Sequence, residues 1–126
     1  THVAGSSEWF ERGFVTYSND AKHHLLGVPE AALRHHGAVS QAVVQAMAQG
    51  AAQRAGVMAS LAVTGVAGPS GGSPDKPVGT VWLGWSVAGQ TTAQRVLLPG
   101  DRAAVRQATA RLALQGLVER LKPSTR

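Results

Sequence analysis

The chain has 126 residues, of which 44% are hydrophobic and 15% charged, a size and composition typical of one globular domain with its own core. It contains no cysteine, which excludes disulfide bonds and thiolate metal sites. The formal net charge is +5, but the basic residues are dispersed and lack interleaved aromatic residues, so we disfavour nucleic-acid binding.

The first half of the chain predicts one short strand and then helices. Residues 13–17 are β-branched and aromatic, which favours the strand. The predicted helices are residues 20–26, 29–35 and 41–55. Polar residues cap the first and third of them, namely Ser18 or Asn19, and Ser40. The apolar face of the third helix consists of Val44, Met47, Ala48, Ala51 and Ala55.

The second half predicts three strands and one long helix. The strands are residues 60–64, 79–87 and 91–98. Gly89 and Gln90 form a hairpin turn between the last two strands. Asp101 caps the final helix and Pro123 ends it. Its predicted apolar stripe is Leu114, Leu117, Val118 and Leu121. This order of elements predicts one layered α/β domain with a mixed sheet.

A segment rich in glycine and proline, residues 65–78, joins the first two of these three strands. Four glycines allow a positive φ or the close approach of a ligand to the backbone. They are Gly65, Gly68, Gly71 and Gly72. The segment matches neither a Walker A loop nor a Rossmann fingerprint. Ser70 fits G-x-S-x-G, but a strand follows it where a nucleophile elbow needs a helix, so we do not assign Ser70 as a nucleophile. A purely structural crossover stays the alternative.

A lysine and two arginines are candidates for proton transfer and anion binding. Lys22 lies one turn into a helix that follows a strand, near Tyr17, and a lysine in a dry pocket can act as a general base. The alternative is a solvated surface lysine. Arg102 and Arg106 share one face of a helix N-terminus, where they can bind a phosphate. The alternative is that Asp101 neutralises Arg102 at the surface.

The histidines and tryptophans are weaker candidates for a functional site. The histidine pairs at 23–24 and 35–36 are adjacent on helices and point in different directions, so we predict no metal site. Trp82 and Trp85 lie three residues apart on a strand and therefore face opposite sides of the sheet.

The uncharged residues 55–74 are interrupted by glycines and prolines, which argues against a membrane span. We expect a cytoplasmic location.

Four stretches of the sequence form a recognisable pattern. Residues 4–22 include Tyr-Ser-Asn-Asp-Ala-Lys at 17–22, and His-Gly-Ala-Val-Ser stands at 36–40. Thr-Gly-Val-Ala-Gly-Pro-Ser-Gly-Gly stands at 64–72, and Lys-Pro-Val-Gly-Thr-Val-Trp follows at 76–82. Together they resemble the CinA C-terminal domain family over residues 4–121, and the likeness is closer to its free-standing bacterial members.

The resemblance implies a three-layer α/β/α sandwich with a mixed β-sheet. It also implies an amidohydrolase of pyridine nucleotide salvage, which converts nicotinamide mononucleotide and water into nicotinate mononucleotide and ammonia. Neither a metal nor a cofactor is implied. The family uses a serine nucleophile activated by lysine, with a tyrosine nearby. The lysine and tyrosine positions fall on Lys22 and Tyr17, and the residue that opens the glycine motif falls on Thr64.

The chain departs from the family pattern before Ala4. Family members carry a helix, a strand and a Glu-Ser-Cys-Thr-Gly-Gly turn there, and that turn holds the nucleophile. We therefore do not transfer its role to Ser6, Ser7 or Ser18. Either the 126 residues belong to a longer enzyme or the chain is a true truncation. We favour the former, a single N-terminally incomplete domain, because losing a central strand would expose a large apolar face.

The expected mechanism uses the family serine to attack the carboxamide carbon while Lys22 takes its proton and Tyr17 orients it. Arg102 or Arg106 binds the 5′-phosphate, Asn19 positions the ribose or the amide, and the four glycines line the site. We expect a homo-oligomer that contacts no membrane. Two alternatives stay open: a nucleotide-binding module without catalysis, and a basic domain that binds nucleic acid or protein.

Overall fold

The computed structural model describes residues 2–122 and is built around an antiparallel sheet. Its strands are β1 (Ala59–Gly65), β2 (Thr80–Val87) and β3 (Gln90–Leu97), in the order β1-β2-β3. Both strand pairs are antiparallel, and Thr64 of β1 lies opposite Trp82 of β2. The three predicted strands of the second half are therefore confirmed to within one residue at each end, whereas parallel pairing, which a mixed sheet requires, is not seen among the described residues.

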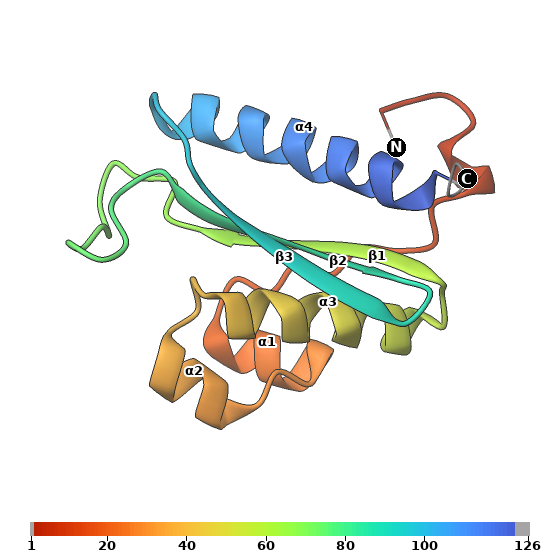
Figure 1. The fold of residues 1–126 in the computed structure, drawn as a ribbon, viewed down its shortest axis with the longest axis horizontal. Helices are drawn as coiled ribbons and strands as arrows, with labels where there is room; N and C mark the ends of the chain where they lie inside the picture. Colours follow the sequence, from red (N-terminus) through yellow and green to blue (C-terminus); the bar gives the residue numbers. More distant parts are fainter. Residues whose placement is uncertain (1, 123–126) are drawn as a thin grey trace.

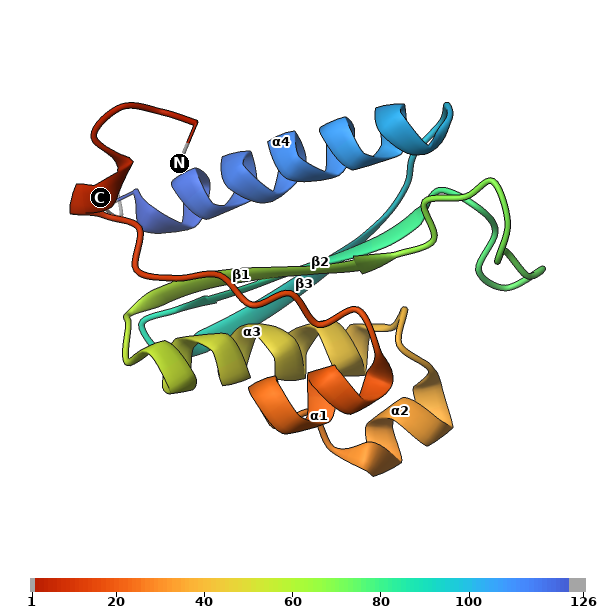
Figure 2. The same ribbon diagram turned by 180° about the vertical axis from the view of Figure 1, so that it is seen from behind.

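Helices lie on both faces of this sheet (Figures 1 and 2). The helical elements are η1 (Ser6–Glu8), α1 (Asn19–Leu26), α2 (Glu30–His36), α3 (Gln41–Ala55) and α4 (Arg102–Leu121). Helix α3 contacts all three strands from one face, with α1 and α2 packed outside it, and α4 covers the other face above β1 and β2. In the described part of the chain, no helix is both long and apolar enough to cross a bilayer.

Side-chain caps explain where three of the helices begin. Ser18 Oγ accepts a hydrogen bond from the backbone N–H of Ala21, at 3.0 Å, and Ser40 Oγ accepts one from Val43, at 3.3 Å. Asp101 caps α4 in the same way. A side-chain oxygen at this position satisfies a helical N–H that has no partner within the helix. The predicted caps Ser40 and Asp101 are thus confirmed, and Ser18 is the cap of α1.

The predicted strand at residues 13–17 is wrong. This stretch is extended and crosses the edge of the sheet between η1 and α1, but it joins no ladder (Figure 2). Val15 and Tyr17 are 86% and 89% exposed, while Phe14 packs against the core on the α3 side. β-branched and aromatic residues favour a strand only where a neighbouring strand supplies hydrogen bonds, and none of the described strands does so here.

The core between α3 and the sheet is tightly closed. Val43, Val44 and Ala48 are completely buried, and Trp82 packs against them from β2. Gly84 lets the helix approach the strand closely, because a Cβ there would lie 2.9 Å from the carbonyl oxygen of Val44. The predicted apolar face of this helix is confirmed at Val44, Met47 and Ala48, which are buried, with Ala51 and Ala55 half-buried.

The core between α4 and the sheet is built around Trp85. Its indole N–H donates to the carbonyl of Ala113, at 2.9 Å, and its ring packs against Gly116, where a Cβ would overlap it. The guanidinium of Arg120 lies 3.8 Å from the ring centroid, and its Nε donates to Thr92 of β3. Trp82 and Trp85 therefore face opposite sides of the sheet, as predicted.

The predicted apolar stripe of the last helix is wrong in three of its four members. Leu114, Val118 and Leu121 are 55%, 55% and 45% exposed, and only Leu117 packs against the core. The buried face consists of Val105, Ala113 and Gly116, since the bulky ring of Trp85 leaves room for small residues only. Pro123, predicted to end this helix, lies outside the described residues.

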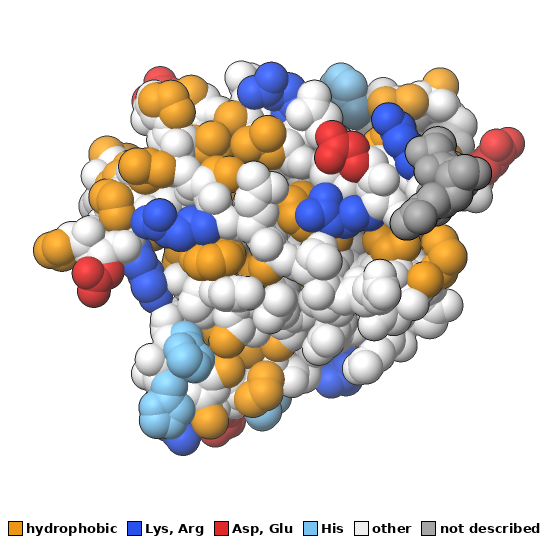
Figure 3. Space-filling model, viewed as in Figure 1, with side chains coloured by type: hydrophobic (Ala, Val, Ile, Leu, Met, Phe, Trp, Pro, Cys, Tyr) orange, Lys and Arg blue, Asp and Glu red, His pale blue; other side chains and the backbone are white. Residues whose placement is uncertain are grey.

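The types of side chain at the surface differ between the α4 side and the α2 side of the molecule. In Figure 3, apolar and basic side chains alternate along the side of the molecule that α4 covers, whereas histidines gather over α2. Of the arginines on α4, Arg120 is stacked on Trp85 and Arg102 is bonded to a backbone carbonyl. Among the described residues, two of the four arginines of α4 are thus engaged within the protein and not free to contact a nucleic-acid backbone.

Candidate functional site

Lys22 is a buried amine without a carboxylate partner in the described part of the chain. Its side chain lies in α1 and is only 7% exposed. Its Nζ donates to the carbonyl oxygen of Thr16, at 2.8 Å, and none of the ion pairs among residues 2–122 includes it. Burial disfavours the ammonium form and lowers the pKa of Lys22 below its ordinary value. Burial therefore makes Lys22 easier to deprotonate than an exposed lysine, and its neutral form can accept a proton.

The predicted neighbours of Lys22 in the sequence, Tyr17 and Asn19, are both exposed. Tyr17 is 89% exposed, and no recorded hydrogen bond joins its hydroxyl to the amine. Asn19 is the exposed first residue of α1, immediately after the cap Ser18. Both residues are placed where a bound molecule could reach them, and neither is held by side-chain contacts within the described chain.

Thr64 has its hydroxyl committed to the backbone. The residue is 8% exposed, near the end of β1, and its Oγ1 donates to the carbonyl of Ala38, at 2.9 Å. The lone pairs of Oγ1 stay available to accept a hydrogen bond, but its proton is in use. Thr64 can therefore orient a donor group, and it also ties β1 to the turn between α2 and α3.

The loop between β1 and β2, residues 66–79, is named here the glycine loop. It carries a cis peptide bond between Gly68 and Pro69. Gly68 has a φ of 81°, and a Cβ there would lie 2.5 Å from Val78 Cγ1, so only glycine fits. A Cβ on Gly65 or Gly72 would likewise press on backbone atoms of neighbouring residues. Close packing explains these three positions, and Gly71 alone meets no neighbour closer than ordinary contact. Ser70 is exposed in this loop and β2 follows it, so it lacks the context of a nucleophile elbow.

The two candidate phosphate-binding arginines have different surroundings. Arg102 Nη1 donates to the carbonyl of Gly68, at 3.0 Å, so this side chain fastens α4 to the glycine loop. Asp101 caps the helix and forms no recorded ion pair with Arg102. Arg106, one turn further along, lines the pocket beside α4. The structure thus gives Arg102 a partner within the protein and leaves Arg106 facing a space that a ligand can enter.

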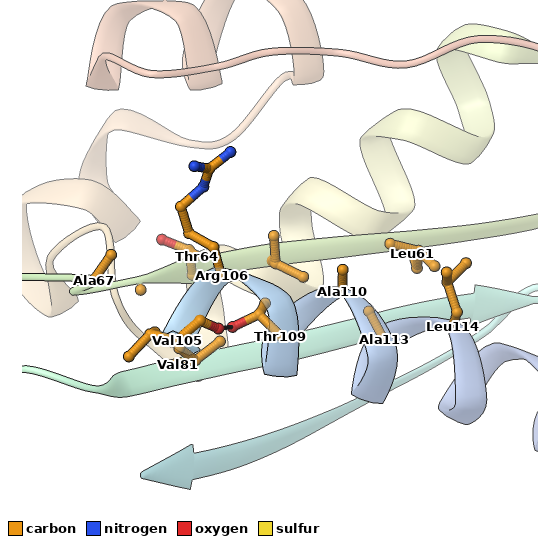
Figure 4. Close-up of a pocket in the computed structure, with 12 residues that line it drawn as sticks. Leu61, Thr64, Ala67, Val81, Val105, Arg106, Thr109, Ala110, Ala113 and Leu114 are labelled. Atoms are coloured by element: carbon orange, nitrogen blue, oxygen red, sulfur yellow. Dashed lines mark hydrogen bonds between the residues drawn. The ribbon is translucent and has the colours of Figure 1, made fainter. Parts of the chain in front are cut away.

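That pocket is an open hollow of about 500 Å³ between β1 and α4. Its lining is mostly apolar, with Thr64, Arg106 and Thr109 as the polar exceptions. Thr64 and Arg106 lie at one end, and Leu61 and Leu114 at the other (Figure 4). Neither Lys22 nor Tyr17 lines it. The described residues therefore present two separate features: a polar pocket end at Thr64 and Arg106, and a buried amine in α1.

One contact that sequence reasoning missed joins the glycine loop to α2. Lys76 Nζ donates to the carbonyl of His36, at 2.6 Å, across forty positions of the chain. The available signal was that Lys76 and His36 stand in two of the four stretches that resemble the family, but nothing in their spacing indicates a contact. Among residues 2–122, no group of three His, Cys, Asp or Glu side chains could hold a metal ion. The absence of a metal or cofactor stays a prediction.

The chain is similar to known proteins over nearly its whole length. The family model described as "CinA C-terminal domain" matches residues 1–121. The protein named "Nicotinamide-nucleotide amidohydrolase PncC" from Pseudomonas putida is 54% identical over 119 residues, which cover 94% of this chain and 74% of that protein. A "CinA-like protein" from Akkermansia muciniphila is 50% identical over 120 residues, which are 94% of this chain and only 29% of that protein.

A solved structure has the same fold. The crystal structure of the competence/damage inducible protein CihA from Agrobacterium tumefaciens superposes with a TM-score of 0.91 at 43% sequence identity. The match covers 94% of this chain and 73% of that one. The match of the family model to nearly the whole sequence and the high identity to these relatives agree with the α/β architecture described above. The chain therefore belongs to the CinA C-terminal domain family.

Proposed function

We propose that this protein is a nicotinamide-nucleotide amidohydrolase, which converts nicotinamide mononucleotide and water into nicotinate mononucleotide and ammonia. The observation that carries the proposal is Lys22, a buried amine with a lowered pKa and no carboxylate partner among the described residues. A structural lysine of this kind is costly, because burial of its charge is not compensated by an opposite charge. The identity to the P. putida protein supports the same activity.

The proposed reaction proceeds in two steps around Lys22. A hydroxyl nucleophile forms a bond to the carboxamide carbon while the neutral amine of Lys22 takes the hydroxyl proton. The ammonium then gives this proton to the amide nitrogen, the C–N bond breaks, and ammonia leaves. In the second step, water attacks the resulting ester, Lys22 takes a proton from the water and returns it to the nucleophile's oxygen, and the carboxylate product is released.

The attacking hydroxyl in this proposal lies on a segment outside the 126 residues. Among residues 2–122, the only recorded partner of Lys22 Nζ is the Thr16 carbonyl. The P. putida relative is longer than the matched region by about a quarter of its length. The edge of β1 and the exposed residues Val15 and Tyr17 leave an apolar surface that a further strand and helix would cover. Completed in this way, the domain would become the three-layer α/β/α sandwich with a mixed sheet predicted above.

The remaining site residues are given binding roles. Arg106 holds the 5′-phosphate, since it lines the pocket and has no hydrogen-bond or ion-pair partner among residues 2–122, and Arg102 keeps Gly68 in place. Thr64 orients the substrate through the lone pairs of its hydroxyl. Tyr17 and Asn19 contact the amide or the ribose from the exposed side of Lys22. The homo-oligomeric state and the cytoplasmic location stay predictions.

A nucleotide-binding module without catalysis is the second candidate. The observation in its favour is that no hydroxyl among residues 2–122 forms a hydrogen bond with Lys22. Such a module would bind nicotinamide mononucleotide and release no ammonia. It would also keep its affinity when Lys22 is replaced, because the amine would have no reaction to serve.

Ammonia release separates these two candidates. The natural full-length protein would be incubated with nicotinamide mononucleotide, and ammonia and nicotinate mononucleotide measured together. Lys22→Met should lower the rate at least about a hundredfold, the usual contribution of general acid–base catalysis. Lys122→Met, a change of the same kind at an exposed lysine, should leave the rate unchanged. Equal rates for the parent and Lys22→Met would refute the assignment of Lys22.

A further inference from the structure

Three consecutive backbone carbonyls, those of residues 36–38 at the end of α2 and in the turn after it, each accept a side-chain hydrogen bond from a different part of the chain. The carbonyl of His36 accepts from Lys76 Nζ, at 2.6 Å. The next carbonyl, that of Gly37, accepts from Ser40 Oγ, at 2.8 Å. The third, that of Ala38, accepts from Thr64 Oγ1, at 2.9 Å. This turn thus binds the glycine loop, the cap of α3 and the end of β1 at one place.

The position of Gly37 fits this arrangement. Its φ is 75°, and a Cβ there would lie only 2.9 Å from Lys76 Nζ. A side chain at residue 37 would therefore be strained and would also displace the lysine amine. Lys76 itself belongs to a tight turn, in which the N–H of Ser73 donates to the Lys76 carbonyl and Ser73 Oγ accepts from the Lys76 N–H. Lys76 is thus held both at its backbone and at the tip of its side chain.

The glycine loop has a second attachment on the opposite side of the sheet. Arg102 of α4 donates to the carbonyl of Gly68, near the start of the loop, while Lys76 is near its end. Both attachments use a cation and a backbone carbonyl, and no carboxylate forms an ion pair with either cation among residues 2–122. Hydrogen bonds of this charged type are stronger than neutral ones.

We propose that Lys76 is a positioning residue, which fastens the glycine loop to the turn at residues 36–38 and so fixes the Thr64 end of the pocket before substrate binds. The effect on catalysis rests on the function proposed above. A loop that is ordered in advance loses less entropy on binding, so its attachment raises affinity. The chemical step at Lys22 does not involve Lys76 directly.

Hydrogen exchange tests the attachment without any assay of activity. In the natural full-length protein, Lys76→Met should speed amide exchange in peptides that span residues 66–79, because the Ser73 and Lys76 amides lose their fixed turn. Lys76→Arg should restore most of the protection, and Lys122→Met should have no effect on this loop. Unchanged exchange in Lys76→Met would overturn the proposal, whatever the activity of the parent.

Steady-state kinetics tests the consequence for binding. Lys76→Met should raise KM for nicotinamide mononucleotide about tenfold, the size expected for one lost charged hydrogen bond, with kcat changed less than about threefold. Lys76→Arg should recover the parent KM. A fall in kcat at constant KM would contradict the positioning role. Faster exchange in the loop together with no ammonia release from the parent would leave the attachment standing and reject the amidohydrolase proposal instead.

A direct contact between Lys76 and the 5′-phosphate of the substrate would give a different kinetic result from the positioning role. If Lys76 bound the 5′-phosphate directly, Lys76→Met would raise the concentration of inorganic phosphate needed to inhibit the enzyme by the same factor as KM. The positioning role predicts that inhibition by inorganic phosphate changes less than twofold, because the free ion does not need the whole loop in place. Parallel changes in the two constants would therefore refute the proposal.

Discussion

The two faces of the sheet differ in how completely they are packed. On the α3 face, Val43, Val44 and Ala48 are completely buried, and Gly84 brings helix and strand close together. On the α4 face, Gly116 lies directly against Trp85, an open pocket of about 500 Å³ borders the same helix, and Leu114 is 55% exposed. Stability should therefore come mainly from the α3 face, whereas the α4 face leaves a mostly apolar pocket open beside Arg106.

The largest expected effect is on the free energy of unfolding, when one side chain on each face of the sheet is truncated to alanine. Met47→Ala on α3 should lower the free energy of unfolding by about 2–5 kcal/mol, because Met47 is 6% exposed and its removal leaves a cavity. Leu114→Ala on α4 should change it by less than about 0.5 kcal/mol, since that side chain is 55% exposed. Urea unfolding measures both values. Equal losses would show that the two faces are packed alike.

A second prediction concerns the close contact between Gly116 of α4 and the ring of Trp85. Gly116→Ala should lower the free energy of unfolding by about 1–3 kcal/mol, because its Cβ would overlap the ring of Trp85. Alanine would otherwise favour the helix, so the sign of the change is informative. The neighbouring exposed position supplies the control, Gln115→Ala, for which no loss is expected. A stabilised Gly116→Ala protein would mean that α4 does not pack on Trp85 as described.

The third prediction separates binding from stability on the α4 face. Arg106→Ala should weaken the binding of nicotinamide mononucleotide about tenfold and leave the urea midpoint unchanged, since Arg106 lines the pocket and has no recorded partner in the described chain. Titration calorimetry and urea unfolding give the two readouts. Arg111→Ala on the same helix is exposed and should change neither. If the two arginines behaved alike, the pocket end at Thr64 would not be the phosphate site.

The smallest effect is a pH dependence of stability from Lys22. Because burial lowers the pKa of Lys22 below its ordinary value of 10.5, the unfolded chain binds more protons than the folded one between the two values. Stability should therefore rise with pH in that window and fall as pH decreases through the folded pKa. Urea unfolding at a series of pH values should show this slope in the parent and lose it in Lys22→Met. The slope's persistence in that variant would assign it to another group.

Local signals in the sequence were sufficient to place the helices. Ser40 and Asp101 each cap a helix through a bond to a residue three positions later, so a short stretch contains the whole cause. Strand positions in the second half followed equally well from alternation and turns. Lys22 could be selected because family resemblance identified its position, whereas its burial and its bond to Thr16 could not be read from the sequence.

The errors arose where distant residues decide the outcome. Leu114 and Val118 have the spacing of a buried stripe, but Trp85 requires small residues and turns α4 so that Ala113 and Gly116 face the sheet. Residues 13–17 have strand composition, but no described strand pairs with them. The bond from Lys76 to His36 spans two segments whose proximity depends on the whole fold.

The intrinsic fluorescence of Trp85 can report whether α4 is packed on the sheet. Its ring is 1% exposed and lies under the guanidinium of Arg120, whereas Trp9 is 67% exposed and Trp82 is half-buried. In a protein with Trp9→Phe and Trp82→Phe, fluorescence would come from Trp85 alone. Its emission would stay at short wavelength and resist quenching by iodide while α4 is docked, and would shift to longer wavelength once the helix separates. The docking of α4 could thus be followed in solution without any added label.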